Sequence, residues 1–289
     1  MWRALGLPGL IDMHVHFMPR SVMDKVWAYF DAAGPLVGTH WPIRYREDEQ
    51  ARLARLADMG VLTFPSLIYP HKPGMAEWLN AWAADFAAAH PHVLRTATFF
   101  PEPGAADYVA GALRSGARVF KAHLQVGGYD PRAPELDAVW GLLAEAAVPV
   151  VVHCGSGPVS AAFTGPGPFG EVLARHPRLT AVVAHMGAPE YRDFLALAQR
   201  HPRVHLDTTM AFTDFTEASQ PFPADLLPVL AELAPRIVLG TDFPNIPYPY
   251  AHQIEVLLRL AHQPHCGYLG DEWLRGVFHD NAARLLAAR

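Results

Sequence analysis

The sequence predicts an α/β protein of the (β/α)₈ TIM-barrel class, folded as a single domain over residues 1–289. Short runs rich in Val, Ile, Leu and Ala alternate with stretches of helical period, as in a parallel sheet covered by helices. Pro and Gly are spread between these runs, and no linker or low-complexity tract divides the chain. The length also suits one barrel, since such barrels commonly have about 250 residues.

Eight apolar runs are expected to form the strands, and several are apolar throughout, as in strands buried on both faces. The expected strands are 10–14, 61–67, 93–99, 117–124, 148–153, 179–185, 203–207 and 236–241. Helices are expected between them at 47–59, 75–89, 136–147, 170–175, 190–200, 224–233 and 250–262, with a terminal helix pair at 271–288.

The longest interruption is an insertion after the first strand, at residues 17–48, and it is rich in aromatic residues and Arg, including Trp41 and Arg44. In a barrel this segment lies over the C-terminal ends of the strands, where active sites are built. We therefore expect it to line a substrate pocket, with packing on the rim as the alternative.

Composition excludes several classes of function. A formal charge of -5 with only three lysines leaves no basic stripe for a nucleic acid. The N-terminus lacks the regions of a signal peptide, and no apolar run approaches the roughly 20 residues of a membrane helix. A cytoplasmic protein that acts on a small molecule is expected, and a homo-oligomer stays open. Two cysteines are too few for a disulfide framework or a Cys-rich zinc site, so His and carboxylates must hold any metal.

Polar residues close several of the apolar strands. His14 and His16 share one face of the first run, because side chains alternate along a strand. His153, His185 and Asp242 follow later runs, and the C-terminal ends of barrel strands converge on the axis. Polar groups in this position are costly unless they are paired or coordinated. The sequence thus predicts one divalent ion held by His14, His16, His153 and Asp242, with Zn²⁺ expected and Mn²⁺ or Fe²⁺ possible.

Other polar residues in or after these strands have separate expected roles. His185 is surplus to the ligand set and is expected to act as a general acid/base or to donate to a developing oxyanion. Lys121, inside an apolar strand, is expected to bind substrate or to be structural, and a carbamylated form that bridges two ions stays open. His123 is either a pocket wall or a satisfied core residue. Cys154 is expected to be a buried apolar residue facing the helices, and Asp207 to hydrogen-bond neighbouring backbone.

The chain resembles the amidohydrolase superfamily, in particular the amidohydrolase-related branch that includes aminocarboxymuconate-semialdehyde decarboxylase and related hydrolases and lactonases. The resemblance spans nearly the whole chain and is carried by Ile11-Asp12-Met13-His14-Val15-His16, Val119-Phe120-Lys121, Val151-Val152-His153-Cys154-Gly155, Ala184-His185-Met186-Gly187, Leu239-Gly240-Thr241-Asp242-Phe243-Pro244 and Asn281-Ala282-Ala283-Arg284-Leu285-Leu286.

This resemblance implies a mononuclear ion on His14, His16, His153 and Asp242. It also implies that His185 helps to activate water and that Asp242 shuttles a proton. Binuclear members use a carbamylated lysine on strand four, so Lys121 keeps a second ion open.

The motifs leave three functions open. The first is a metal-dependent hydrolase that cleaves an ester, lactone or amide of a small molecule with metal-activated water. The second is a nonoxidative decarboxylase of an unsaturated or aromatic acid, with Arg44 binding the carboxylate. The third, of another class, is a noncatalytic barrel with a structural metal. The residues expected to bind substrate are Lys121, Arg44 and Trp41.

Overall fold

The computed structural model describes residues 2–34, 38, 40–263 and 269–287. Its strands are all parallel and follow the order of the chain in two sheets. The first sheet contains β1 (Leu10–Ile11), β2 (Val61–Pro65) and β3 (Val93–Leu94). The second contains β4 (Thr96–Thr98), β5 (Val119–His123), β6 (Val150–His153), β7 (Ala181–Val183), β8 (Val204–Asp207) and β9 (Ile237–Val238).

Backbone hydrogen bonds connect the first strand run to the last. The amide of Met13 donates to the carbonyl of Leu239 at 2.8 Å, and that of His16 donates to Phe243 at 2.7 Å. The first sheet ends with β3 and the second begins with β4. These two strands are the two halves of the expected third strand, which is interrupted at Arg95. The strands therefore form the expected barrel, with the expected third strand divided in two.

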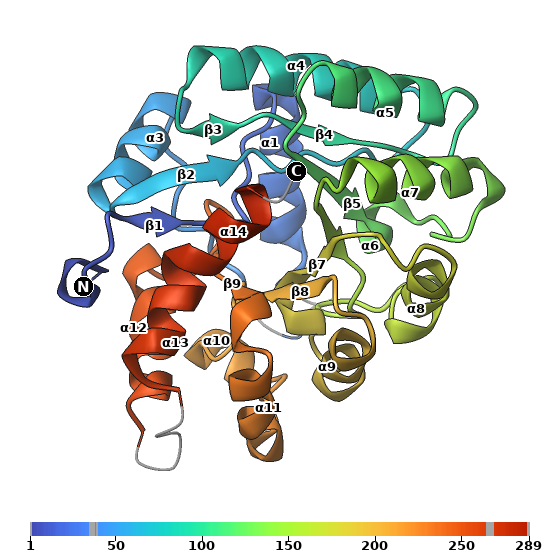
Figure 1. The fold of residues 1–289 in the computed structure, drawn as a ribbon. Coiled ribbons are helices and arrows are strands. Elements are labelled where there is room, and N and C mark those ends of the chain that lie inside the picture. Colours follow the sequence, from blue (N-terminus) through green and yellow to red (C-terminus); the bar gives the residue numbers. More distant parts are fainter. Residues whose placement is uncertain (1, 35–37, 39, 264–268, 288–289) are drawn as a thin grey trace.

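The helices surround the strands (Figure 1). Along the chain they are α1 (Arg20–Ala32), α3 (Glu49–Asp58), α4 (Ala76–Ala89), α5 (Ala105–Arg114), α6 (Leu124–Gly127), α7 (Pro134–Ala146), α8 (Pro166–Arg175), α9 (Tyr191–Arg200), α10 (Asp214–Glu217), α11 (Leu227–Glu232), α12 (Tyr250–Ala261), α13 (Gly270–Arg275) and α14 (Asn281–Ala287). The expected terminal pair corresponds to α13 and α14, joined by a π-helical turn at Gly276–Asp280. No helix within these described ranges has the length and apolar character needed to cross a bilayer.

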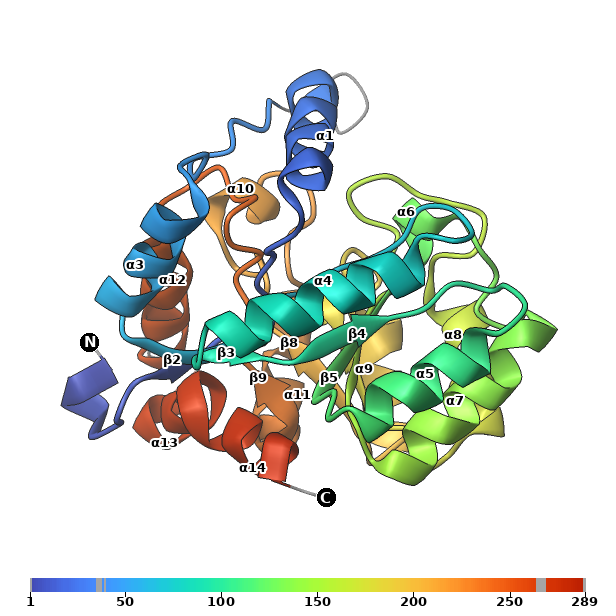
Figure 2. The ribbon, with the colours of Figure 1, turned by 90° about the horizontal axis from the view of Figure 1, so that it is seen from above.

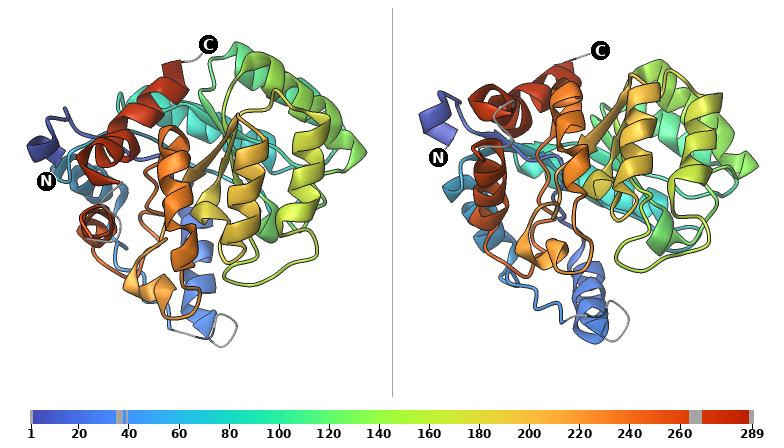
Figure 3. Two further views of the ribbon diagram at one scale, coloured as in Figure 1. Left: turned by 60° about the horizontal axis from the view of Figure 1, so that its bottom comes forward. Right: turned by 90° about the horizontal axis from the view of Figure 1, so that it is seen from below.

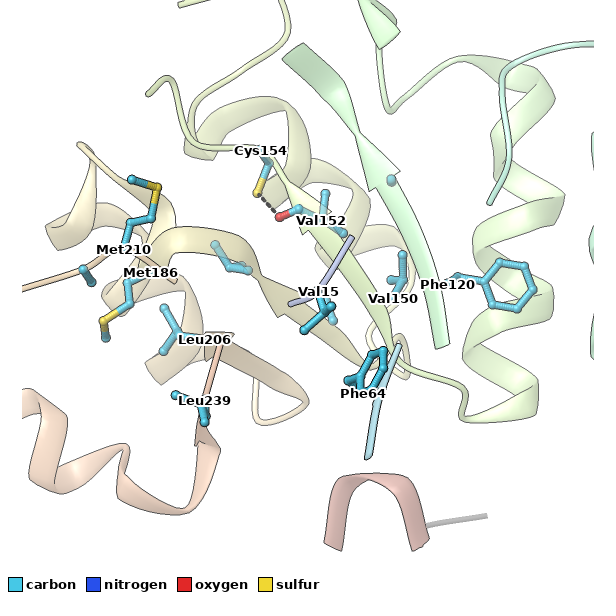
Figure 4. Packing of buried hydrophobic residues seen from close by; sticks show 14 of the residues in the cluster. Val15, Phe64, Phe120, Val150, Val152, Cys154, Met186, Leu206, Met210 and Leu239 are labelled. Atoms are coloured by element: carbon cyan, nitrogen blue, oxygen red, sulfur yellow. Dashed lines mark hydrogen bonds between the residues drawn. The ribbon is translucent and has the colours of Figure 1, made fainter. Parts of the chain in front are cut away.

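The hydrophobic core has an outer and an inner layer, because strand side chains alternate. The outer layer packs the strands against the helices and includes Phe120, Val150 and Leu206 (Figure 4). Cys154 belongs to this layer, with its Sγ 3.8 Å from the carbonyl of Val152, which confirms its expected place on the helix side.

The inner layer closes one end of the barrel. It contains Val119, Val151, Val182 and Val238 from the strands, and Ala282, Leu285 and Leu286 from α14. Helix α14 and both termini lie at this end, whereas α1 projects from the opposite end (Figures 2 and 3). The closed end leaves the C-terminal ends of the strands, beneath α1, as the place for a site.

Candidate metal centre and active-site cavity

Three of the four expected ligands come together at the C-terminal ends of the strands. His14, His16 and Asp242 are buried, and each has a possible ligand atom within 4.8 Å of those of the other two. Oδ1 of Asp242 lies 3.0 Å from Nε2 of His16 and 3.7 Å from Nε2 of His14. The amide of Asp242 also donates to the carbonyl of His14 at 2.9 Å, so the backbone itself holds the two segments together.

The second nitrogen of each imidazole is fixed by a hydrogen bond. Nδ1 of His16 lies 2.7 Å from the carbonyl of Leu67, which only accepts, so this nitrogen carries the proton. Nδ1 of His14 lies 2.9 Å from Oδ2 of Asp207 and donates to that carboxylate in the same way. Both Nε2 atoms then face Asp242, and they are the ring atoms left available to a metal.

The charges of this cluster fit a divalent cation. Burial lowers the pKa of His14 well below its ordinary value, so the imidazole is neutral. Burial alone raises the pKa of Asp242, but close contact with His16 and the nearby imidazoles outweigh it and leave the pKa below its usual value. A 3.0 Å contact between Nε2 of His16 and Oδ1 of Asp242 joins two electron-pair donors, so a proton or a metal ion must lie between them. Two imidazoles and a carboxylate suit Zn²⁺, Mn²⁺ or Fe²⁺.

Asp207, at the end of β8, holds both sides of this cluster. Besides Nδ1 of His14, it accepts from the backbone amides of His185 at 2.9 Å and Thr209 at 3.1 Å. The expected backbone bonds of Asp207 are therefore confirmed. Its bond to the His14 ring was not predicted, although an acidic residue closing an apolar strand was the signal for it. Burial raises the pKa of Asp207.

Asp12 supports the first strand run from behind. Its carboxylate accepts from the backbone amide of His14 at 3.0 Å, the hydroxyl of Thr241 at 2.6 Å and the phenol of Tyr250 at 3.1 Å. Complete burial raises its pKa to about 7. Asp12 thus joins the segments that carry His14 and Asp242 without pointing at the cavity itself.

Two residues of the site have left-handed backbone conformations. Asp242 has φ 68°, and His185 has φ 55° in the short 3₁₀ segment Ala184–Gly187. Such conformations are costly for residues other than Gly and are found where surrounding structure enforces them, often at functional sites. In this conformation the amide of His185 donates to Asp207.

His185 lies between the cluster and His153. Its ring centroid is 5.1 Å from that of His14 and 4.8 Å from that of His153. Burial lowers its pKa to about 4, so it is neutral near pH 7 and able to accept a proton. Its predicted role as a general acid/base stays a prediction, with this position as its geometric basis.

His153 is not part of the three-residue cluster. Its Nε2 lies 2.9 Å from the carbonyl of Gly157 and must donate to it, which leaves Nδ1 as the atom with a lone pair. Its ring stacks on His123 with a centroid distance of 4.1 Å. The ligand role of His153 therefore stays a prediction. Both His153 and His123 line the cavity, so His123 is a wall residue.

Lys121 lies directly beside the cluster but beneath the cavity. It is completely buried, and its Nζ is 3.5 Å from Nε2 of His14. Burial lowers its pKa to about 8, against the opposite influence of Asp207 and Asp242. Lys121 is absent from the residues described as lining the cavity, so direct contact with substrate stays a prediction.

A cavity of about 730 Å³ opens above the cluster. His14, His16, His185 and Asp242 line it together with residues of α1, α4 and α6. From the insertion, Trp41 lines the cavity, and its Nε1 donates to the carbonyl of Asn245 at 2.7 Å; its contact with substrate stays a prediction.

Arg44 is not among the cavity residues, contrary to expectation. Side chains alternate along residues 41–46, so that Trp41, Ile43 and Tyr45 are buried, whereas Arg44 and Arg46 are exposed. This period of two is typical of an extended segment with one face on the protein. It places Arg44 on the outer face, away from the candidate metal centre.

Comparisons with known proteins agree with this architecture. The family model described as Amidohydrolase matches residues 11–287. No curated protein matches the chain. Among solved structures, an uncharacterized TIM-barrel protein from Bordetella bronchiseptica aligns with a TM-score of 0.72 at 20% identity, over 96% of this chain and 98% of that one.

Two further solved structures carry enzyme names. A 5-carboxyvanillate decarboxylase from Novosphingobium aromaticivorans, in complex with manganese and 4-hydroxy-3-methoxy-5-nitrobenzoic acid, aligns with a TM-score of 0.61 at 15% identity over 98% of this chain and 97% of that one. A probable 2-pyrone-4,6-dicarboxylic acid hydrolase from Acinetobacter baumannii, with citric acid bound, gives 0.58 at 12% identity over 96% and 99%. These likenesses establish the barrel fold, and the match of the family model over almost the whole chain shows that this protein is an enzyme of the amidohydrolase family.

Proposed function

We propose that the protein is a metal-dependent hydrolase that cleaves a C–O or C–N bond in an ester, lactone or amide of a small molecule. The observation that carries this proposal is the convergence of two imidazoles and one carboxylate in the lining of a large cavity. His14, His16 and Asp242 would hold one divalent ion, with His153 as a further ligand and Zn²⁺ as the expected ion. A second ion would require carbamylation of Lys121.

The chain's own residues supply positioning and proton transfer in this proposal. When bound, a divalent ion lowers the pKa of water and polarises a carbonyl. Asp242 is ionised and can accept a proton at the floor of the cavity. His185, neutral and facing the same space, can take up the proton that the attacking water loses and then pass it to the leaving group. Trp41 and Tyr69 line the walls of the same cavity, so they help to keep water away from the reacting groups.

Asp242→Asn tests the assignment. The substitution keeps the shape of the side chain but removes its negative charge and its ability to take up a proton. We expect kcat/KM for the best substrate in a panel of esters, lactones and amides to fall on the order of 10²- to 10⁴-fold. Circular dichroism should show an intact fold. Asp214→Asn, at an exposed site on α10, is the matched control and should keep wild-type activity. A folded Asp242→Asn protein with near wild-type turnover is incompatible with the proposal.

Nonoxidative decarboxylation is the second candidate, favoured by the alignment with a 5-carboxyvanillate decarboxylase. The exposed position of Arg44 removes the residue first expected to bind the carboxylate. The two reactions differ in their products. Hydrolysis in H₂¹⁸O transfers ¹⁸O to the product, whereas decarboxylation releases carbon dioxide and replaces the lost carboxylate by a proton from solvent. Mass spectrometry of the product mixture separates them.

A further inference from the structure

The mouth of the cavity carries two of the chain's three lysines. Lys25 comes from α1, and Lys72 from the loop between β2 and α4, so the lysines approach from two separate segments. Both side chains are exposed at the mouth. The third lysine, Lys121, is buried beside His14 and is not at the mouth. The few lysines of this chain are thus concentrated at the site.

Helix α1 turns one face toward the cavity. Val22, Lys25 and Tyr29 lie three or four residues apart, as required for one helical face, and all three line the cavity. The other side of the helix is held to the protein by Met23 and Trp27, which are buried. Nε1 of Trp27 donates to Oδ1 of Asn245 at 3.1 Å. The direction of Lys25 therefore follows from the packing of α1.

The positive charge at the mouth is not neutralised within the protein. Among residues 2–34, 38, 40–263 and 269–287, neither lysine has a carboxylate within 4.0 Å. The acidic residues of α1 are engaged elsewhere, since Asp24 pairs with Arg20 and Asp31 pairs with Arg46.

The cavity itself offers the lysines no counter-charge at the mouth. Asp242 is the one carboxylate among the described residues that line it, and this side chain belongs to the cluster at the floor. Oδ1 of Asp242 is held 3.0 Å from Nε2 of His16. An anionic group at the mouth is therefore attracted by Lys25 and Lys72, and no carboxylate on the described walls near the mouth repels it.

The same mouth is lined with exposed apolar side chains. Tyr29 on α1 and Trp78 on α4 are each 49% exposed, and Val126 on α6 is 43% exposed. All three line the cavity, whereas the other large apolar side chains with comparable exposure in the described ranges, Met59 and Leu62, lie outside it. Exposed aromatic rings around a cavity indicate contact with a ligand, because a flat apolar ligand that covers them removes much apolar surface from water and so binds favourably.

We propose that the substrate is a planar, apolar compound, such as an aromatic one, that carries an anionic group remote from the bond that reacts. Lys25 and Lys72 bind this remote anion at the mouth, and Tyr29 and Trp78 contact the planar body. The reacting group reaches His14, His16 and Asp242 at the floor. The inference rests on the proposed function, since it assigns a substrate class to the same cavity, and it makes the two lysines determinants of specificity.

Binding of a matched pair of probes tests this inference without turnover. The probes are 2,6-naphthalenedicarboxylate and 6-(hydroxymethyl)-2-naphthoate, which differ only in the second carboxylate. Naphthalene fluorescence titration with the metal-loaded protein gives both dissociation constants. Wild-type protein should bind the dicarboxylate about tenfold more tightly. Lys25→Met and Lys72→Met should each weaken dicarboxylate binding about threefold, and the double variant should lose the preference.

The control variant is Arg203→Met, which removes one positive charge from an exposed side chain at the start of the strand run before β8. It should leave both dissociation constants unchanged. Lys25→Arg, which keeps the positive charge, should keep most of the preference for the dicarboxylate.

The inference is overturned if the wild-type protein shows no preference or the double variant keeps it. It is also overturned if the lysine variants lose affinity equally for both probes, because that result reports lost packing. The fate of the proposed function is separate. A protein that shows the preference but hydrolyses no ester, lactone or amide keeps this inference and loses the proposed function. A protein that hydrolyses uncharged esters and shows no preference for the dicarboxylate keeps the proposed function and loses this inference.

Discussion

Asp207 determines the orientation of two histidines at once, through Nδ1 of His14 and the backbone amide of His185. Its carboxylate only accepts hydrogen bonds, so it fixes the proton of His14 on Nδ1 and leaves Nε2 free for a metal. An amide at this position can present its own N–H to the ring and favour the other tautomer. The metal site therefore depends on a side chain that does not touch the metal.

Asp207→Asn should lower the affinity for Zn²⁺ about 10- to 100-fold, the usual cost of losing a hydrogen bond to a liganding histidine. Competition with a chromophoric chelator measures this affinity, and the melting temperature of the metal-free protein is recorded beside it. Asp193→Asn, on the exposed side of α9, is the control and should bind as tightly as wild type. Unchanged affinity in a folded Asp207→Asn protein would show that Asp207 is only structural.

The sequence predicted those site residues whose positions follow from the alternation of side chains along a strand. His14 and His16 meet Asp242 because they share one face at a strand end, and this follows from a period of two. The ligand role of His153 stays a prediction: the side chain lines the same cavity, and the carbonyl of Gly157 holds its Nε2 in a bond that no pattern in the sequence marks. Arg44 was expected to bind substrate but lies outside the cavity. Apolar residues alternate with others at 41–46, which is the period of an extended segment and places Arg44 on the opposite face from Trp41.

At the scale of elements, long periodic segments were predicted well and element ends less well. The helices expected at 75–89 and 190–200 correspond to α4 and α9. Strand ends were overestimated near the site, where the backbone leaves regular pairing to bind side chains. His185, expected to close a strand, instead lies in the segment Ala184–Gly187 with a positive φ, and its amide donates to Asp207. Such bonds between segments distant in sequence have no local signal.

Helix α1 offers a test at this scale, because one buried ring anchors it. Trp27 is 5% exposed, hydrogen-bonds Asn245 and stacks near the guanidinium of Arg52, 5.4 Å from its ring. Trp27→Ala should lower the free energy of unfolding by about 3–5 kcal/mol, as buried aromatic truncations do. It should also speed hydrogen exchange within residues 20–32.

Tyr29→Ala is the control on the same helix. Its ring is half exposed, so the free energy of unfolding should change by less than about 0.5 kcal/mol. Chemical denaturation and hydrogen-exchange mass spectrometry provide both readouts. Equal and small effects of the two substitutions would mean that Trp27 does not anchor α1.

For the whole molecule, acid sensitivity should have a contribution from His205 in β8. Its strand position pairs with Val182 of the inner core, and its Nδ1 has no hydrogen-bond partner among the described residues. Burial, with a further effect of Arg236, lowers its pKa from 6.5 to about 4. The unfolded chain then binds a proton more readily than the folded protein, so stability is complete above pH 6.5 and declines as the pH falls toward 4.

His205→Leu should remove this contribution. Between pH 7 and pH 4 the wild-type protein should lose up to about 3 kcal/mol more of its free energy of unfolding than the variant does. Urea denaturation of both metal-free proteins across this pH range measures the two free energies of unfolding. Their difference reports His205, because the other titrating groups contribute equally to both proteins. Parallel stability curves would show that His205 is not held neutral by the fold.

The central claim is that His14, His16 and Asp242 hold one divalent ion, and metal content per chain tests it most directly. Plasma mass spectrometry of protein purified without chelator should find about one equivalent in the wild type and in a His262→Ala control, whose imidazole is exposed on the far end of α12. His14→Ala should lose it. Near two equivalents would indicate a second ion on a carbamylated Lys121. No bound ion after reconstitution with Zn²⁺, Mn²⁺ or Fe²⁺, or full retention in His14→Ala, would contradict the account.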